Sequence, residues 1–228
     1  MTPLDRLRDA LSVPPHLKRF YHDFRGRQFR ILDIGCGHHS PAKVKRYFPY
    51  CEYHGLDLEM VELDENDRRL MTRFYKANLE TDTLDAVPDN YFDVIVMSHV
   101  IEHLHHGVEA LNRLARKLRT GGLFYIEYPG WRSLGVPSAK AGFLHFSDDP
   151  THVRLYTLQE VVNILLANRF TILKAGTRRD RMRLLFTPLL LMRGLLHGNL
   201  WSGRPWDAFG IAEYVYARAP VRPDEASD

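Results

Sequence analysis

Short apolar runs alternate along this chain with longer segments in which apolar residues recur every three or four positions. The apolar runs predict strands over residues 30–34, 51–57, 74–78, 91–98, 123–127, 170–175 and 213–217. Segments with helical spacing lie between several of them, as at Val108, Leu111 and Leu114, where Gly121-Gly122 is expected to end the helix. This alternation is typical of an α/β fold built on a parallel, doubly wound sheet.

The two ends of the chain carry helical patterns outside this alternation. Residues 2–13 predict a short amphipathic helix, and residues 17–24 predict a second one. Both are expected to pack on the main domain, with a lid over a substrate pocket as the alternative. The apolar segment 182–201 is broken by Arg183, Pro188 and Arg193, whereas a membrane-spanning helix needs about 20 mostly apolar residues. We therefore predict no transmembrane segment, and leave open a pocket cover or a peripheral membrane contact.

Composition and charge narrow the class of protein without identifying it. The chain has 228 residues, of which 45% are hydrophobic and 26% charged, as in ordinary globular proteins. A formal charge of +3 is spread along the chain, so no nucleic-acid partner is expected. The two cysteines, Cys36 and Cys51, are too few for a disulfide framework and lack zinc-like spacing. With no secretory pattern after Met1, a cytoplasmic location is the default expectation.

The first strand runs into a glycine turn that predicts a ligand site. Asp33-Ile34-Gly35-Cys36-Gly37 is followed by Ser40, an expected N-cap, and Pro41, which suits a first helical turn. A strand, a glycine turn and a helix start together favour a nucleotide-like ligand. Asp57 ends the second strand 20 residues beyond Gly37, where a carboxylate can accept both hydroxyls of a ribose.

Five segments in order resemble the class I S-adenosylmethionine-dependent methyltransferases. They are Ile31-Leu32-Asp33-Ile34-Gly35-Cys36-Gly37, Gly55-Leu56-Asp57, Tyr91-Phe92-Asp93-Val94-Ile95-Val96, His99-Val100-Ile101-Glu102-His103-Leu104 and Leu118-Arg119-Thr120-Gly121-Gly122. The resemblance implies a Rossmann-like, seven-stranded sheet whose last strand is antiparallel, with S-adenosylmethionine as cofactor. It also implies one methyltransferase domain over residues 1–219, divided into an N-terminal cover (1–28), a cofactor-binding half (29–128) and an acceptor-side half (129–219). Residues 220–228 are expected to be a flexible tail.

The resemblance assigns the cofactor to ten positions of this chain. They are Asp33, Gly35, Cys36, Gly37, Asp57, Leu58, Asn78, Leu79, Ser98 and His99. The methionine part would lie over the glycine turn and near Ser98 and His99, the ribose at Asp57, and the adenine beside Asn78 and Leu79. The chain departs from the family pattern in having His39 where a third glycine is common, and Asn78 where an aspartate is commoner.

The acceptor side offers histidines and arginines. We predict His152 as a general base, with His145 second, because methylation of a hydroxyl needs its proton removed; the alternative is that either imidazole only holds its loop in place. His99 and His103 have the spacing of helical metal ligands, but the resemblance makes this segment an ordinary strand exit, and no metal is expected. Four arginines, at positions 178, 179, 181 and 183, are expected on a solvated edge, with a phosphate grip as the alternative.

The expected function is methyl transfer from S-adenosylmethionine to a small-molecule or conjugated acceptor. An oxygen acceptor, sugar- or lipid-linked, is favoured, and a phosphate-bearing acceptor stays open. One alternative is an NAD(P)-dependent oxidoreductase, against which Ser40 replaces the last glycine of the dinucleotide fingerprint. Another is a non-catalytic protein of the same fold that binds a partner.

Overall fold

The computed structural model describes residues 13–37, 39–60, 63–135, 146–179, 181–196 and 210–221. The helix predicted over residues 2–13 lies almost wholly outside these ranges. So do His145 and most of the expected tail.

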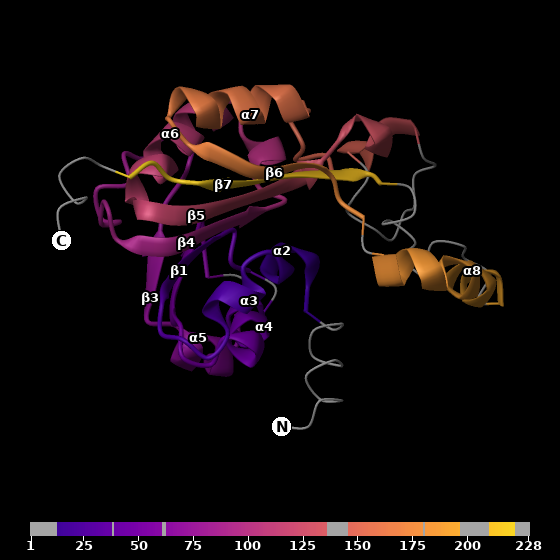
Figure 1. Ribbon diagram of the computed structural model, residues 1–228, viewed down its shortest axis with the longest axis horizontal. Helices are drawn as coiled ribbons and strands as arrows, with labels where there is room; N and C mark the ends of the chain where they lie inside the picture. The colour runs from indigo at the N-terminus through magenta and orange to yellow at the C-terminus, as the bar shows by residue number, and fades with distance from the viewer. Residues whose placement is uncertain are drawn as a thin grey trace.

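A seven-stranded sheet forms the centre of the domain (Figure 1). Its strands are β1 (Arg30–Ile34), β2 (Glu52–Asp57), β3 (Arg73–Lys76), β4 (Phe92–Ser98), β5 (Leu118–Pro129), β6 (Thr171–Thr177) and β7 (Ala212–Arg218). The order is β3-β2-β1-β4-β5-β7-β6, and the first five strands pair in parallel. The last strand in the chain is inserted antiparallel between β5 and β6. The predicted mixed seven-stranded sheet is confirmed.

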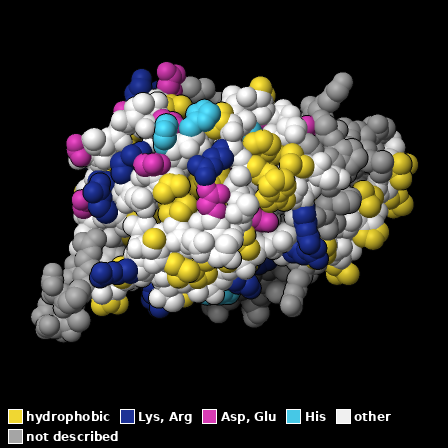
Figure 2. All heavy atoms as spheres, turned by 90° about the horizontal axis from the view of Figure 1, so that it is seen from above, with side chains coloured by type: hydrophobic (Ala, Val, Ile, Leu, Met, Phe, Trp, Pro, Cys, Tyr) yellow, Lys and Arg dark blue, Asp and Glu magenta, His cyan; other side chains and the backbone are white. Residues whose placement is uncertain are grey.

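Helices cover both faces of this sheet (Figure 1). They are α2 (Pro15–Lys18), α3 (Tyr21–Phe24), α4 (Ser40–Tyr47), α5 (Glu65–Leu70), α6 (Gly107–Lys117), α7 (Leu158–Ala167) and α8 (Arg181–Leu196), with 3-10 turns η1 (Ile101–His103), η2 (Trp131–Gly135) and η3 (Phe146–Asp148). One face carries α6 and α7 and the other carries α2, α3, α4 and α5, while α8 lies at one end of the sheet. Figure 2 looks down on the α6–α7 side and shows acidic and basic side chains interspersed there, with apolar side chains at the end where α8 lies.

Each face has its own core. On the α6–α7 side, Leu111, Leu114 and Leu165 pack against the sheet. The other core includes Leu17 and Phe20 from the N-terminal helices, and the Phe20 ring stacks on Phe48 with centroids 5.4 Å apart. Because both faces are covered, the central strands are mostly apolar, as at residues 94–97 of β4. Residues 15–24 pack on the domain as expected, but as the two short helices α2 and α3 in place of the one helix predicted over residues 17–24.

Two local expectations are wrong. Gly121-Gly122 does not end a helix: α6 stops at Lys117 and β5 begins at Leu118. Gly121 has φ +69° within β5, where the pairing with β4 shifts register, and a glycine takes this conformation without a Cβ clash. Ser40 does not cap α4, because His39 occupies the N-cap position at φ 59°. The Ser40 hydroxyl instead donates a hydrogen bond to Asp33 Oδ2.

Candidate active site

A cavity of about 380 Å³ opens at the carboxyl ends of β1, β2 and β4. The strand order reverses between β1 and β4, and such a switch point is where open α/β sheets bind ligands. Six of the ten residues predicted to bind the cofactor line this cavity, namely Gly35, Asp57, Leu58, Asn78, Leu79 and His99. The structure thus brings together residues that lie up to 64 positions apart in the sequence.

Gly35 forms the floor of this cavity and only glycine fits there. Its φ is +72°, and a Cβ at this position would lie 2.5 Å from Val100 Cγ2. Its backbone N–H donates to Leu56 O at 2.8 Å, which ties the turn to β2. The absence of a side chain therefore lets the Val100 side chain, which also lines the cavity, pack directly on the backbone of the turn.

Asp57 stands at the end of β2, facing the glycine turn. Its Oδ2 accepts from the Gly37 N–H at 3.2 Å, and its Oδ1 accepts from the Leu58 N–H at 2.8 Å. Each carboxylate oxygen has two lone-pair sites, so both can accept further hydrogen bonds from a diol. This geometry suits the ribose role that the resemblance implies.

Asn78 and Leu79 follow β3, which ends at Lys76. The Asn78 side-chain oxygen accepts from the Glu80 N–H at 2.9 Å, so the amide helps to hold the turn that borders the cavity. Leu79 is buried and supplies an apolar wall. The adenine contact predicted for these two residues is compatible with this arrangement.

The other predicted cofactor residues, Asp33, Cys36, Gly37 and Ser98, are not part of the cavity lining. The Asp33 carboxylate accepts hydrogen bonds from the hydroxyls of Ser40 and Tyr53, both to Oδ2, and burial raises its pKa. Cys36 packs its sulfur against Gly55, and burial raises the pKa of the thiol so that it stays protonated. Asp33 and Cys36 therefore stabilise the glycine turn without lining the cavity.

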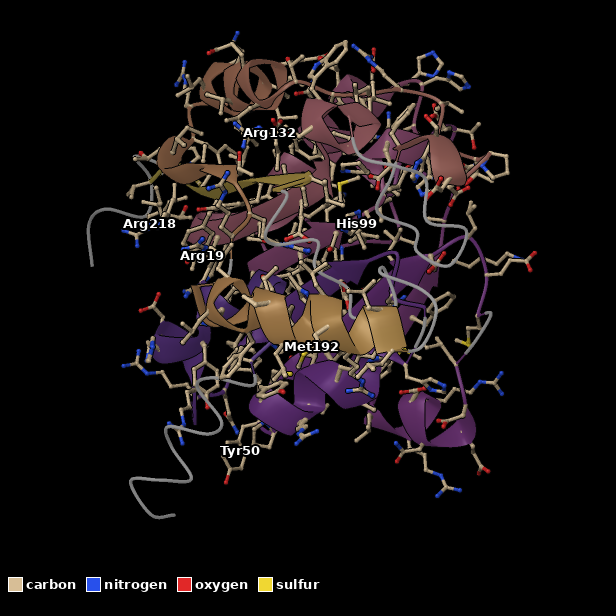
Figure 3. The ribbon with its side chains drawn as sticks, turned by 90° about the vertical axis from the view of Figure 1, so that its right-hand side faces the viewer. Arg19, Tyr50, His99, Arg132, Met192 and Arg218 are labelled. Carbon is tan, nitrogen blue, oxygen red and sulfur yellow. The ribbon has the colours of Figure 1, made fainter. Side chains whose placement is uncertain are left out.

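A buried charge network lies where β4 and β5 end. Glu127 accepts a hydrogen bond from the Arg178 guanidinium and another from the Tyr125 hydroxyl. The two ring nitrogens of His99 lie 3.1 Å from Glu102 Oε1 and 3.2 Å from Glu127 Oε1. Burial opposes a charged imidazole, but these two carboxylates outweigh it and raise the pKa of His99 to about 9. His99 is therefore a cation in the wall of the cavity (Figure 3).

His152 lies in the loop before α7, and its side chain is 2% exposed. Its Nδ1 donates to Phe146 O at 2.7 Å, and its ring lies against His103, with centroids 4.7 Å apart. Because a carbonyl oxygen only accepts, the lone pair of the neutral ring is on Nε2. Because His103 lines the cavity, His152 lies next to the cavity wall. His145 lies outside the described residues.

Among the four arginines, the structure describes Arg178 and Arg179 in full. The Arg178 guanidinium is bound to Glu127 at the end of the sheet, and Arg179 is exposed. The side chains of Arg181 and Arg183 lie outside the described part. The expected solvated edge therefore does not apply to Arg178, whose side chain is buried against a carboxylate.

Two acidic residues of this site were missed by the sequence reasoning. Glu102 and Glu127 are each 1% exposed. The available clue was the context of Glu127, which stands in the otherwise apolar run 123–128; Glu102 lies between Ile101 and His103 and offered no such signal. A charged residue in such a run is rarely buried unless it is paired.

The fold and this site together define a class I S-adenosylmethionine-dependent methyltransferase. The profile of the family described as "Methyltransferase domain" matches residues 5–175. The chain belongs to this family and carries a methyltransferase domain with the fold of S-adenosylmethionine-dependent enzymes.

The individual curated proteins that the chain matches are only distantly similar to it in sequence. The chain is 29% identical over 146 residues to mycinamicin VI 2''-O-methyltransferase of Micromonospora griseorubida, a match that covers 56% of this chain and 35% of that enzyme. The chain covers only 27% to 38% of the length of the curated relatives that it matches.

Among solved structures, an S-adenosylmethionine-dependent methyltransferase from Archaeoglobus fulgidus superposes with a TM-score of 0.58 at 19% identity, covering 95% of this chain and 100% of the other. The 1,6-didemethyltoxoflavin-N1-methyltransferase of Burkholderia thailandensis, solved with S-adenosylhomocysteine, has a TM-score of 0.57 at 18% identity, over 96% of this chain and 81% of that one. At these identities, the superpositions support the fold.

The cavity fits the methyl donor in its chemistry. Gly35 presents backbone in the lining, the Asp57 carboxylate suits a diol, and Leu58 and Leu79 offer apolar surface for a base. Of the helices that the structure describes, none is long and apolar enough to cross a bilayer.

Proposed function

We propose that this methyltransferase acts on an oxygen atom of a small-molecule or conjugated acceptor. The observation that carries the proposal is the placement of His152, whose Nε2 keeps its lone pair and which lies against His103 in the cavity wall. Nitrogen acceptors with a free lone pair need no such group, whereas a hydroxyl must lose its proton. Similarity to mycinamicin VI 2''-O-methyltransferase supports an oxygen acceptor.

The residues of the site would act mainly by alignment. Bound S-adenosylmethionine supplies an electrophilic methyl group on a sulfonium. Holding an acceptor in line with it can remove about 7–11 kcal/mol of the barrier. Removal of the acceptor proton, which we assign to His152, adds about 10²- to 10⁴-fold. The apolar Val100 and Leu104 in the cavity wall would exclude water from this region.

The donor and the acceptor are tested separately. Thermal unfolding with S-adenosylhomocysteine or with NAD identifies the nucleotide: stabilisation by NAD alone would overturn the donor assignment. Transfer of a radiolabelled methyl group to a panel of hydroxylated sugars, lipids, quinones and natural products identifies the acceptor. Methylation confined to amines in such a panel would contradict the oxygen proposal.

Two finer features of the acceptor are part of the proposal. A phosphate grip would fall to Arg179, because Arg178 is bound to Glu127. A lipid-linked acceptor would suit α8, whose exposed residues Leu185, Leu189, Met192 and Leu196 follow one stripe of the helix. Figure 3 looks onto this helix and shows Met192 on it. Arg193 on the same helix would favour an anionic bilayer surface.

A further inference from the structure

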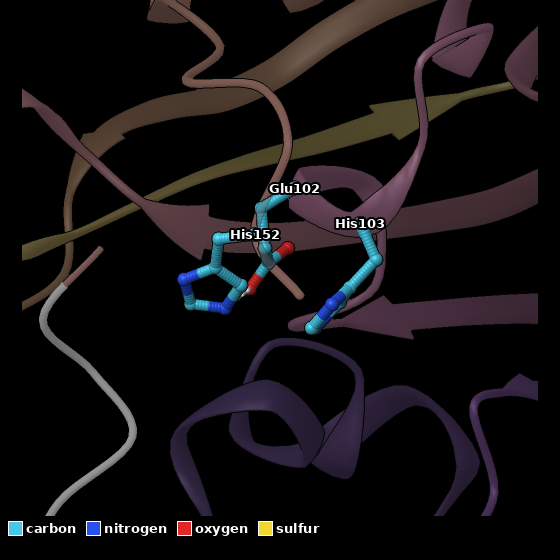
Figure 4. A group of neighbouring side chains, drawn as sticks. All are labelled: Glu102, His103 and His152. Atoms are coloured by element: carbon cyan, nitrogen blue, oxygen red, sulfur yellow. Dashed lines mark ion pairs between the residues drawn. The ribbon is translucent and has the colours of Figure 1, made fainter. Parts of the chain in front are cut away.

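We propose that Glu102, His103 and His152 bind a divalent first-row metal ion beside the methyl-donor cavity. One ligand atom from each of the three lies within 4.8 Å of those of the other two. Glu102 and His103 come from η1, and His152 reaches the same point from the loop before α7 (Figure 4). Ligand atoms of a tetrahedral site with bonds of 2.0–2.2 Å lie about 3.4 Å apart, so small side-chain adjustments would close this set around an ion.

Both imidazoles are oriented as metal ligands are. His152 Nδ1 donates to Phe146 O at 2.7 Å, and His103 Nδ1 lies 3.2 Å from Thr151 O. The Thr151 hydroxyl lies 2.9 Å from His103 Nδ1, but it donates its proton to Asp149 Oδ1. Since neither a carbonyl oxygen nor this hydroxyl has a proton to give to the ring, each neutral ring has its hydrogen on Nδ1 and its lone pair on Nε2. In metal-binding histidines, the ring nitrogen that does not bind the metal characteristically donates a hydrogen bond to a carbonyl or carboxylate in this way.

The buried carboxylate of Glu102 lacks a hydrogen-bond partner for one of its two oxygens among the described residues. Its Oε1 lies 3.1 Å from His99 Nδ1, but Oε2 is buried and has no hydrogen-bond partner among the residues that the structure describes. The distance from Oε1 to His152 Nε2, 3.9 Å, is too long for a hydrogen bond. Leaving a buried carboxylate oxygen unpaired is costly, and a cation between Glu102 and the two imidazoles would remove that cost.

The backbone holds these ligands together before any ion binds. Glu102 O accepts hydrogen bonds from the N–H groups of Val153 and Arg154 at 2.9 and 3.1 Å, which joins η1 to the loop that carries His152. Two segments some fifty residues apart are thus fixed to each other at the ligands. A preformed site loses little conformational freedom on binding the ion.

A second acidic and histidine group, His39, Asp64 and Asp67, serves as a contrast. Asp67 Oδ1 accepts from the Ala42 N–H, and Oδ2 accepts from His39 and from the Asp64 N–H. Its oxygens already have partners, and the group caps α5. Of these two groups, only the one with Glu102 has both closely spaced ligand atoms and a buried carboxylate oxygen without a partner among the described residues.

The donor set indicates the kind of ion and its role. Two imidazoles and one carboxylate suit Zn²⁺, Co²⁺ or Mn²⁺ better than Mg²⁺ or Ca²⁺, which prefer oxygen ligands. Three protein ligands leave positions open for an acceptor hydroxyl, whose pKa the ion would lower. This inference rests on the proposed oxygen acceptor. It makes His152 a metal ligand, and the bound ion, in place of the His152 imidazole, promotes loss of the acceptor proton to solvent.

The methyl transfer balances in this arrangement. The hydroxyl proton passes to solvent, and the oxygen lone pair forms the new O–C bond as the S–C bond breaks with its electrons left on sulfur. The products are the methylated acceptor, S-adenosylhomocysteine and one proton.

The test is metal binding by the full-length, untagged chain after treatment with a chelator. Calorimetry with Zn²⁺ and visible absorbance with Co²⁺ should show one ion per chain, with no donor or acceptor present. His103→Gln, at a half-buried position that tolerates the change, should weaken binding at least 100-fold. Glu102→Gln and His152→Gln should do the same, while His105→Gln, an exposed histidine of the same segment, should bind as the original chain does.

Failure of the ion to bind, or equal binding by the His103→Gln and His105→Gln variants, would overturn the metal site and return His152 to the role of a direct base. Binding of S-adenosylhomocysteine is measured on the same chelated protein. Donor binding without metal binding rejects only the metal site. Metal binding without donor binding supports the metal site and rejects the methyltransferase assignment on which its role depends.

Discussion

The carboxylate of Asp57 accepts a hydrogen bond at 3.2 Å from the backbone N–H of Gly37, joining the end of β2 to the turn that follows β1. Twenty residues separate the two in the sequence. Because the strands are parallel neighbours, their carboxyl ends meet, and one side chain both holds the glycine turn and faces the cavity. The donor site therefore depends on this one carboxylate for its shape and for its polarity.

Asp57→Asn should weaken donor binding without unfolding the protein. The amide keeps one acceptor oxygen but loses the charge, and a hydrogen bond to a charged group contributes about 1.5–3 kcal/mol. We expect the Kd for S-adenosylhomocysteine, measured by calorimetry, to rise about 10- to 100-fold. Glu59→Gln, two residues further along and exposed, should leave it unchanged. An unaltered Kd for Asp57→Asn would remove Asp57 from the donor site.

His152→Ala should keep donor affinity and lose turnover. Whether the imidazole takes the acceptor proton itself or holds an ion that does so, the loss should be about 10²- to 10⁴-fold in kcat. The Kd for S-adenosylhomocysteine should stay within about twofold, because His152 does not line the donor cavity. Single-turnover methyl transfer with the acceptor found by the panel measures the rate. Full turnover by the variant would exclude any chemical role for His152.

Arg178→Met should destabilise the fold substantially. Glu127 is 1% exposed and its pKa lies well below the usual range, despite burial, because the Arg178 guanidinium and His99 favour its charged form. Removing one partner of a buried ion pair leaves the other uncompensated, at a cost of about 3–5 kcal/mol. Urea unfolding measures this loss. Lys174→Met on the exposed part of β6 is the control, and an equal effect of both variants would mean that the pair is not structural.

His16 should make the free energy of unfolding depend on pH between about 4 and 6.5. Burial lowers the pKa of His16 to about 4, so the unfolded chain binds more protons than the folded one in this window. Stability should rise with pH there, by about 1.4 kcal/mol for each unit of pKa difference. Below pH 4 and above 6.5 this contribution stays constant.

The measurement is the difference in unfolding free energy between the original chain and His16→Gln across that pH range. The difference should change with pH for His16→Gln and stay flat for His22→Gln, an exposed histidine on the neighbouring helix. Parallel pH profiles for the original chain and His16→Gln would contradict the depressed pKa.

The exposed stripe of α8 predicts association with anionic vesicles. Leu189 and Met192 are 55% and 53% exposed, and burying such side chains at a bilayer surface is favourable. In flotation with vesicles that contain acidic lipid, the original chain should float. The double variant Leu189→Lys and Met192→Lys should stay at the bottom. If neither protein floats, the lipid contact is rejected and a covering role for α8 remains.

The central strands β1, β2 and β4 were predicted within one residue of their observed bounds because most of their residues are buried. An apolar run such as that of β4 can only be a buried strand covered by helices on each face, and the structure has it over Phe92–Ser98. The errors fall where a few residues decide the backbone. Gly121 was expected to end a helix and instead bends a strand, and His39 took the N-cap position that Ser40 was expected to fill. A glycine takes a positive φ both at a helix end and in a bulged strand, so local pattern could not separate the two at Gly121, whereas at His39 the positive φ was itself unexpected.

By itself, the sequence determined the order of strands and helices, the glycine turn and the acidic residue 20 positions later, because these depend on spacing along one or two neighbouring strands. Only the tertiary structure decided which distant polar groups meet. Glu102 and His152 come together because η1 and the loop before α7 exchange backbone hydrogen bonds. Glu127 and Arg178 pair because β5 and the end of β6 lie at the same edge of the sheet, on either side of β7. The site where the acceptor is expected is made of such long-range contacts, and no periodicity in the chain encodes them.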